Sequence, residues 1–253
     1  MSDDSLYSYE QVLVPSKGIC YPATWTKEGK ISLRPMTTEE EKILTTVRFV
    51  KSGKAIDMIF KACLENKDID VGELLSGDRS FLLYYLRAIS YGAAYDYKIE
   101  CPSCSMTFET TYNLNDIVIR FLKDSFKEPI EYTLPIGKKK VCFRLMRGKD
   151  ETRILEDRDR RLANFGADQI DNTLTNRLSS VIQSVDGNED KVFIEKFINR
   201  MIAGDSAAFR NKIDEEEPGI STEHRNICPK CAKEFTVDVP VGSNFFSVSK
   251  TKN

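Results

Sequence analysis

The stretch Cys101-Pro102-Ser103-Cys104 recurs 127 residues later as Cys228-Pro229-Lys230-Cys231. Short segments in which apolar and polar residues alternate flank each copy, and this is the pattern of a β-strand. A Cys-Pro-x-Cys turn directs two thiolates into one small volume, and four such sulfurs form a tetrahedral shell at about 2.3 Å from a zinc ion. The repeat therefore predicts one structural zinc with four ligands, Cys101, Cys104, Cys228 and Cys231.

Two other interpretations of the cysteines stay open at this point. The pairs could be independent half-sites completed by other residues, and His224, the only histidine, lies four positions before Cys228. Either pair could also be a thioredoxin-type redox site, although such pairs open a helix, whereas these lie between strand-like segments. Seven cysteines is an odd number, which fits metal thiolates in a reducing compartment better than a disulfide framework. The remaining three are expected to be core or lining thiols: Cys20, Cys63 and Cys142.

The surroundings of the cysteine pairs recur as well. Residues 31–36 match residues 141–146 at an offset of 110, and Gly77-Asp78 matches Gly204-Asp205 at an offset of 127. The sequence therefore predicts an α+β fold of internally duplicated strand-helices-strand units, joined at a zinc-ribbon-like site of four cysteines. An approximate two-fold axis near the metal is expected to relate the two units.

This pattern divides the chain into five segments. They are an N-terminal extended arm (1–29), a first repeat unit (30–112), connecting strands (113–140), a second repeat unit (141–240) and a C-terminal tail (241–253). In the first unit, apolar spacing predicts helices from about residue 38 to 50, after Gly53, and from Asp78 as the helix cap to Gly92. In the second unit, helical spacing continues to Val185, and the acidic segment 215–221 is expected to be an exposed turn.

The composition of the chain argues against several classes of protein function. The 253 residues are 41% hydrophobic and 30% charged with a net charge of −2, which gives no overall attraction to nucleic acid or to an anionic membrane. No apolar stretch approaches the ~18 residues of a membrane span, and the polar, acidic first residues are unlike a secretory signal. A single histidine and the lack of a phosphate-binding glycine loop argue against an enzyme. The expected output is therefore binding.

Two aromatic segments are candidate contact surfaces. The tyrosines between residues 84 and 97 exceed what one helix face can bury, and tyrosine is enriched at interfaces. The tail places two phenylalanines in a short polar segment. Each segment has an equally simple alternative, because the tyrosines could form a packed core and the tail could dock on its own body. The residues expected to bind a partner are Tyr91, Tyr95, Phe245 and Phe246.

Four segments resemble baseplate assembly proteins of contractile-tailed, T-even-type bacteriophages. They are LRPMTTEEE (33–41), LSGDRSFLL (75–83), LRAISYG (86–92) and ECPSC (100–104). The resemblance covers mainly residues 30–112 and the second cysteine pair, and Leu145 departs from the pattern where the first copy has Pro35. It implies a non-enzymatic baseplate hub subunit or hub assembly chaperone that acts in the host cytoplasm and contacts other hub proteins, with self-association left open.

A nucleic-acid-binding zinc-ribbon module is the main rival to a hub assembly factor. The near-neutral charge and the lack of interleaved basic and aromatic residues around the cysteines count against this rival. An enzyme is the third possibility and has the least support in the sequence.

Overall fold

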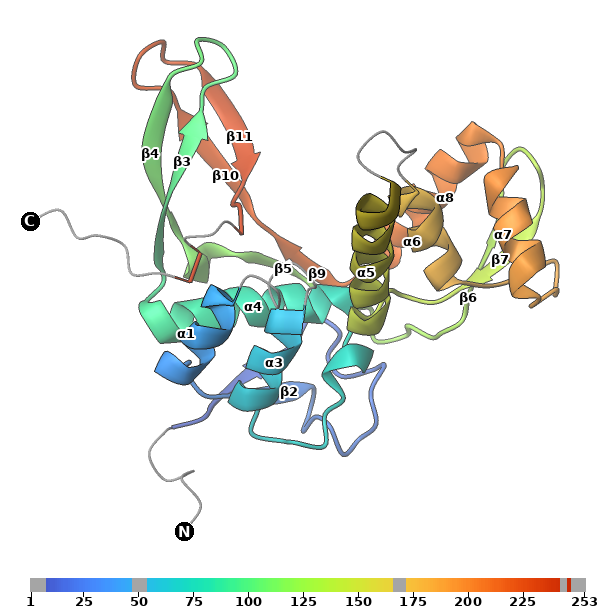
Figure 1. Cartoon of the computed structure of the whole chain (residues 1–253), viewed down its shortest axis with the longest axis horizontal. Coiled ribbons are helices and arrows are strands. Elements are labelled where there is room, and N and C mark those ends of the chain that lie inside the picture. Colours follow the sequence, from blue (N-terminus) through green and yellow to red (C-terminus); the bar gives the residue numbers. More distant parts are fainter. Residues whose placement is uncertain (1–7, 47–53, 166–171, 242–244, 247–253) are drawn as a thin grey trace, which may run out of the picture.

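The computed structural model describes residues 8–46, 54–165, 172–241 and 245–246. Within them the chain has a mixed α+β fold of seven α-helices and small antiparallel sheets. Figure 1 shows three parts, which we call the first helical unit (residues 10–91), the second helical unit (residues 130–216) and the hairpin pair (residues 94–113 and 223–238). None of the described helices is both long and apolar enough to cross a membrane.

The first helical unit packs its helices against a two-stranded sheet. Its elements are β1 (Glu10–Leu13), β2 (Lys30–Leu33), α1 (Thr38–Thr45), α3 (Lys54–Cys63), the 3-10 turn η2 (Val71–Glu73) and α4 (Ser76–Tyr91). Part of the expected N-terminal arm is thus a strand, because β1 pairs with β2 and Val14 is fully buried. The helix expected to reach residue 50 ends at Thr45 in α1, and residues 47–53 lie outside the described part of the chain.

The second helical unit surrounds a three-stranded antiparallel sheet in the order β6-β7-β8. Its elements are β6 (Ile130–Thr133), β7 (Lys140–Phe143), α5 (Gly148–Phe165), α6 (Thr173–Val181), β8 (Ile182–Val185), α7 (Lys191–Asn199) and α8 (Ala203–Glu216). The expected helical continuation to Val185 is wrong: residues 182–185 are a strand because they pair with β7. In this strand, Ile182 and Val185 are buried in the core of the unit.

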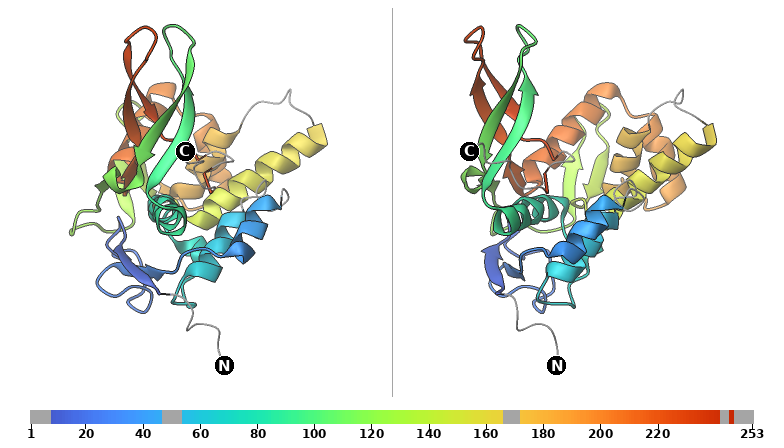
Figure 2. Two further views of the ribbon diagram at one scale, coloured as in Figure 1. Left: turned by 90° about the vertical axis from the view of Figure 1, so that its left-hand side faces the viewer. Right: turned by 60° about the vertical axis from the view of Figure 1, so that its left-hand side comes forward.

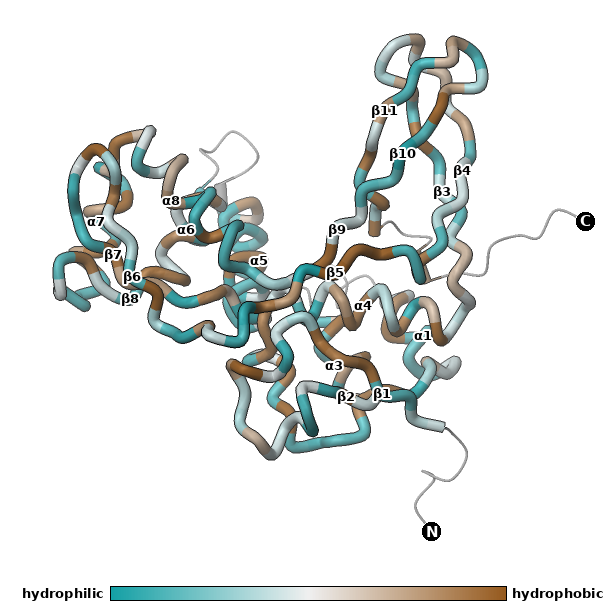
Figure 3. Tube along the Cα trace, turned by 180° about the vertical axis from the view of Figure 1, so that it is seen from behind, coloured by the Kyte–Doolittle hydropathy of each residue, from teal (hydrophilic) through white to brown (hydrophobic). Residues whose placement is uncertain are grey.

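The hairpin pair stands away from the helical units. Its strands are β3 (Ala94–Glu100) with β4 (Thr107–Asn113), and β10 (Glu223–Ile227) with β11 (Glu234–Asp238). The two hairpins lie side by side in every view, with the cysteine turns at their far ends (Figures 1 and 2). Hydrophobic and hydrophilic residues alternate along them (Figure 3), so each hairpin has one face that packs against the other.

A small sheet connects these parts. After the 3-10 turn η3 (Leu114–Asp116), β5 (Val118–Arg120) pairs with β9 (Gly219–Ser221). The expectation of an exposed turn over residues 215–221 is therefore wrong, since Pro218 and Gly219 are buried. They are buried because this segment crosses the start of α4, where a Cβ on Gly77 would lie 1.8 Å from the carbonyl oxygen of Pro218.

We expect Gly77→Ala to destabilise the fold by about 2 kcal/mol or more, because backbone cannot yield as a flexible side chain does. Gly204→Ala is the matched control at the corresponding place in α8, where the added Cβ would meet the flexible Cδ1 of exposed Ile136. Urea unfolding of both variants tests this. Equal, small effects would show that β9 can move away from α4.

The two helical units meet at an antiparallel crossing of the segments that precede α4 and α5. The Ser76 N–H donates to the carbonyl of Met146 and the Gly148 N–H donates to the carbonyl of Leu74, each at 2.9 Å. Leu75 is fully covered there and packs in a cluster with Leu145. The crossing thus combines main-chain hydrogen bonds with an apolar contact.

Several hydrogen bonds occur in both helical units at matching places. Arg34 forms a two-pronged ion pair with Glu40, and Arg144 forms the same pair with Asp150. Asp78 and Asp205, buried in the first turns of α4 and α8, accept the N–H of Ser16 and of Ile136 at 2.8 Å. Asp78 is therefore not the expected helix cap: α4 begins at Ser76, and the carboxylate of Asp78 anchors the segment after β1.

Candidate metal centre

Each cysteine turn is shaped by the hairpin that carries it. In the first turn, the Cys101 N–H donates to the Met106 carbonyl and the Ser105 N–H to the Cys101 carbonyl, both at 2.9 Å. In the second, the same bonds join Cys228 to Lys233 at 3.0 Å and Ala232 to Cys228 at 2.9 Å. Ser105 and Ala232 both have a left-handed backbone, with φ of 54° and 56°. The two turns therefore present their sulfurs in the same way.

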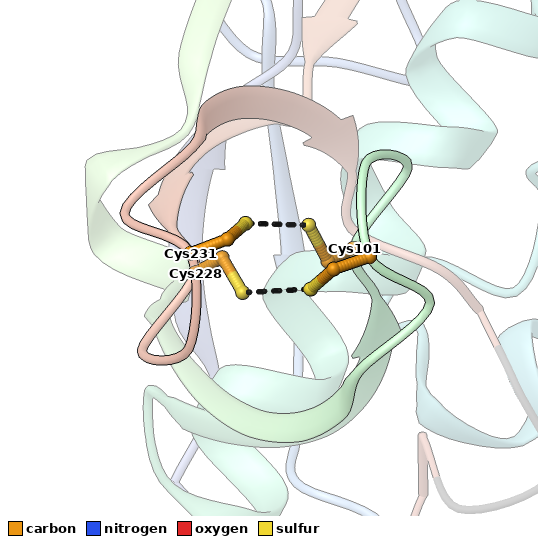
Figure 4. A group of neighbouring side chains, drawn as sticks. Cys101, Cys228 and Cys231 are labelled. Carbon is orange, nitrogen blue, oxygen red and sulfur yellow. Dashed lines mark hydrogen bonds between the residues drawn. The ribbon is translucent and has the colours of Figure 1, made fainter.

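The four sulfurs face one another across the hairpin pair (Figure 4). The Sγ atoms of Cys101 and Cys231 lie 3.7 Å apart, those of Cys104 and Cys228 lie 3.6 Å apart, and all four lie within 4.8 Å of one another. A tetrahedral zinc with bonds of about 2.3 Å requires sulfurs separated by about 3.8 Å. The cluster therefore has the donor type, number and spacing to bind one metal ion.

The electrostatics of the cluster favour a thiolate. Burial raises the pKa of Cys228, but hydrogen bonds from the N–H groups of Cys231 and Lys230 and from neighbouring thiols outweigh it and bring the pKa to about 6. The Met106 N–H lowers the pKa of Cys104, while burial and the neighbouring sulfurs raise it to about 12. A bound cation would remove the remaining protons, because only the thiolate binds metal.

The cluster is partly shielded from solvent. Cys101 and Cys228 are buried, Cys104 is half-buried and Cys231 is exposed. Four thiolates complete a tetrahedral shell and leave no position for a reacting water, so the arrangement suits a structural metal.

His224, the alternative ligand for the second cysteine pair, contacts other residues of the hairpin pair. Its Nδ1 is 2.8 Å from the hydroxyl of Tyr97, and burial lowers its pKa. The two hairpins also contact through Thr110, whose hydroxyl donates to Asn226, and through an edge-to-face pair of Phe108 with Phe235. These contacts hold the cysteine turns opposite each other.

The other three cysteines are not part of the four-cysteine cluster. Cys63 is fully buried in the core of the first helical unit, as expected for a core thiol. Burial is the main cause that raises the pKa of Cys63 and of half-buried Cys20 to about 12. Cys142 is half-buried on β7.

The predicted partner anchors divide into two groups. Phe245 and Tyr95 are buried in the chain's own core, with ring centroids 5.1 Å apart, so the tail docks on its own body at Phe245. This corrects the expectation of an exposed tail anchor. Tyr91 and Phe246 are half-buried, and their ring centroids lie 6.5 Å apart. Residues 242–244 and 247–253 lie outside the described part of the chain.

Sequence reasoning missed Arg87, which holds this arrangement together. Arg87 is fully buried, donates through Nε to the carbonyl of Phe245 and through Nη1 to that of Gly92 at 2.7 Å, and lies over the rings of Tyr91 and Tyr95. Its signal was an arginine at helical spacing from Tyr84 and Tyr91, on a face otherwise expected to be aromatic.

With the fold and the cysteine cluster established, comparison with known families places the protein. The family model described as T4 bacteriophage base plate protein matches residues 14–247. The chain therefore belongs to the T4 bacteriophage baseplate protein family, which implies contacts with other baseplate proteins. Searches of curated proteins and of solved structures found no match.

Proposed function

We propose that this protein is a non-enzymatic assembly factor of the tail baseplate hub, either a chaperone or a hub subunit, that acts in the host cytoplasm. The observation that carries the proposal is the family match, which extends over both helical units and the hairpin pair. The chemistry of the cysteine cluster agrees with it, since a closed shell of sulfurs supports structure rather than a reaction.

The metal in this proposal is zinc, with Cys101, Cys104, Cys228 and Cys231 as its ligands. Support comes from the sulfur separations of 3.6 and 3.7 Å and from the matching turn geometry. The zinc ties the two hairpins at their far ends, where each hairpin alone has only two strands, a size that is marginal in water. It therefore fixes the position of the second hairpin against the first.

We also propose that the chain is an internal duplication. The paired bonds of Arg34 with Arg144 and of Asp78 with Asp205 support this, as does the shared turn geometry. An approximate two-fold axis near the metal is proposed to relate the two units. The segments that join helix to hairpin differ in length: α4 reaches β3 through residues 92–93, whereas α8 reaches β10 through a longer segment that contains β9.

The surface proposed to contact a hub protein includes Tyr91 and Phe246. Both remain half-exposed beside the buried Phe245, so they can add contact area without disturbing the core. Partly exposed aromatic side chains of this kind are enriched at the centres of protein interfaces.

Co-expression with individual baseplate hub proteins, followed by affinity capture, tests this function. We expect the zinc-loaded chain to retain one of them and Phe246→Ala with Tyr91→Ala to reduce its capture about tenfold. Phe193→Ala, at an exposed phenylalanine on α7, is the control and should capture normally. The hub function would be contradicted if no hub protein were retained. If the chain with Phe246→Ala and Tyr91→Ala captured a hub protein as well as the Phe193→Ala control, the contact surface would lie elsewhere.

The same preparation tests the nucleic-acid alternative. The outer faces of the hairpins carry paired charges of both signs, such as Lys98 with Glu109 and Arg225 with Glu234. Such faces give little attraction to phosphates. Salt-dependent micromolar binding to random DNA would favour the zinc-ribbon module over the hub factor.

A further inference from the structure

In the crossing between the two helical units, each side contributes one main-chain N–H donor and one carbonyl acceptor. We call residues 73–76, just before and at the start of α4, the first entry surface, and residues 145–149, which lead into α5, the second lead segment. Besides their two main-chain hydrogen bonds, the two are joined by charge, because Glu73 accepts an ion pair from Lys149 and lies 3.6 Å from the guanidinium of Arg147.

The second helical unit has a corresponding entry surface, residues 200–203, at the start of α8. The correspondence is carried by the backbone: the N–H of Arg79 donates to Leu75, and the N–H of Ser206 donates to Ile202, both at 2.9 Å. The burial differs sharply. Leu75 is 1% exposed, whereas Ile202 is 49% exposed, and its neighbour Ala203 is exposed as well.

The first helical unit likewise has a lead segment, residues 35–39, which enters α1. The ion pair of Arg34 with Glu40 places it in register with residues 145–149. In the second lead segment Gly148 is buried under the first entry surface, but the corresponding Thr38 is exposed. Within the described residues, each unit therefore has one segment that corresponds to a side of this crossing but is not covered by a partner segment: the entry surface of the second unit and the lead segment of the first.

The two uncovered segments carry opposite charges, as the two sides of the existing crossing do. The signs are exchanged: here the entry surface is basic and the lead segment is acidic. Arg200 stands where the first entry surface has Glu73, and Glu39 stands where the second lead segment has Lys149. Both are exposed. The opposite combinations, Glu73 with Glu39 and Arg200 with Lys149, would place like charges together, which disfavours wrong partners.

The sizes are complementary too. In the existing crossing, the guanidinium of Arg79 lies where a Cβ on residue 148 would be, within 2.6 Å, so glycine is required there. Helix α8 has Ser206 where α4 has Arg79, which leaves room beside the second entry surface for the Cβ of Thr38. Neither donor position, Ala203 or Thr38, is a proline, so both main-chain hydrogen bonds can form.

We propose that the second entry surface binds the first lead segment of another copy of this chain, and repeats between molecules the crossing that joins the two units within one. The contact is head-to-tail, so successive copies form a ring or an open chain. It rests on the proposed correspondence of the two units and is independent of which hub protein is bound.

Sedimentation of the purified, zinc-loaded full chain at low salt, from about 1 to 100 µM, tests the proposal. We expect the wild type to self-associate, and Arg200→Glu or Glu39→Lys to weaken association about fivefold or more. The double variant, which restores opposite charges, should return to within about twofold of the wild type. Ile202→Asp should weaken association about tenfold or more.

Lys98→Glu, a charge reversal on the outer face of a hairpin, is the control and should associate like the wild type. Zinc content and circular dichroism verify that each variant is folded. A wild type that stays monomeric throughout this range would overturn the proposal, as would a double variant no better than the single ones. Capture of a hub protein is measured separately, with substitutions at Tyr91 and Phe246 in place of those at Glu39 and Arg200.

Discussion

Replacing Cys101 or Cys228 with serine should remove the metal from the purified chain and separate the two hairpins. Each cysteine supplies one of four sulfurs, and three sulfurs and a hydroxyl form a much weaker site for zinc. Structural zinc commonly contributes on the order of 10 kcal/mol to the folding of small domains, so the loss of stability should be large. Elemental analysis and thermal unfolding measure the two effects on the same sample.

Cys142→Ser is the matched control, because Cys142 is half-buried on β7, away from the cysteine cluster. It should keep one zinc per chain. Two zinc ions per wild-type chain would contradict a shared site, and so would full metal retention in Cys228→Ser. Acidification should also release the metal, because protons compete with it for the four sulfurs and only the thiolate form binds.

The cysteine cluster could be predicted because its geometry is local. A Cys-Pro-x-Cys turn fixes two sulfurs by itself, and its flanking alternation fixes a hairpin. The remaining step, that the two turns face each other, followed from their repetition. The helices α3, α4 and α7 could also be predicted from the sequence, because their apolar residues recur at regular helical spacing.

The features that were missed depend on contacts between distant segments. Residues 182–185 have helical spacing but form β8, because β7 offers an open edge beside them. Pro218 and Gly219 look like an exposed turn, yet they are buried where β9 crosses Gly77. The docking of the tail involves Arg87, which donates a hydrogen bond to the carbonyl of Phe245, 158 residues away in the sequence. No local pattern encodes such pairings.

The burial of Phe245 reverses what the sequence led us to expect of the tail. The ring of Phe245 is fully buried, edge-on to Tyr84 and Tyr95, with ring centroids 4.9 Å and 5.1 Å apart. Around it, Tyr84 and Tyr95 donate hydrogen bonds to the carbonyls of Val239 and Pro240.

Phe245→Ala should therefore lower the free energy of unfolding by about 3–5 kcal/mol, the usual effect of removing a buried phenylalanine ring. The cavity would also leave Arg87 less well covered, because its guanidinium donates to the backbone at this residue. Urea unfolding followed by circular dichroism measures the change. Phe193→Ala, at a phenylalanine that is 40% exposed, is the control and should cost about 1 kcal/mol or less. Equal effects of the two substitutions would mean that the tail leaves this core in solution, and would return Phe245 to the list of candidate partner anchors.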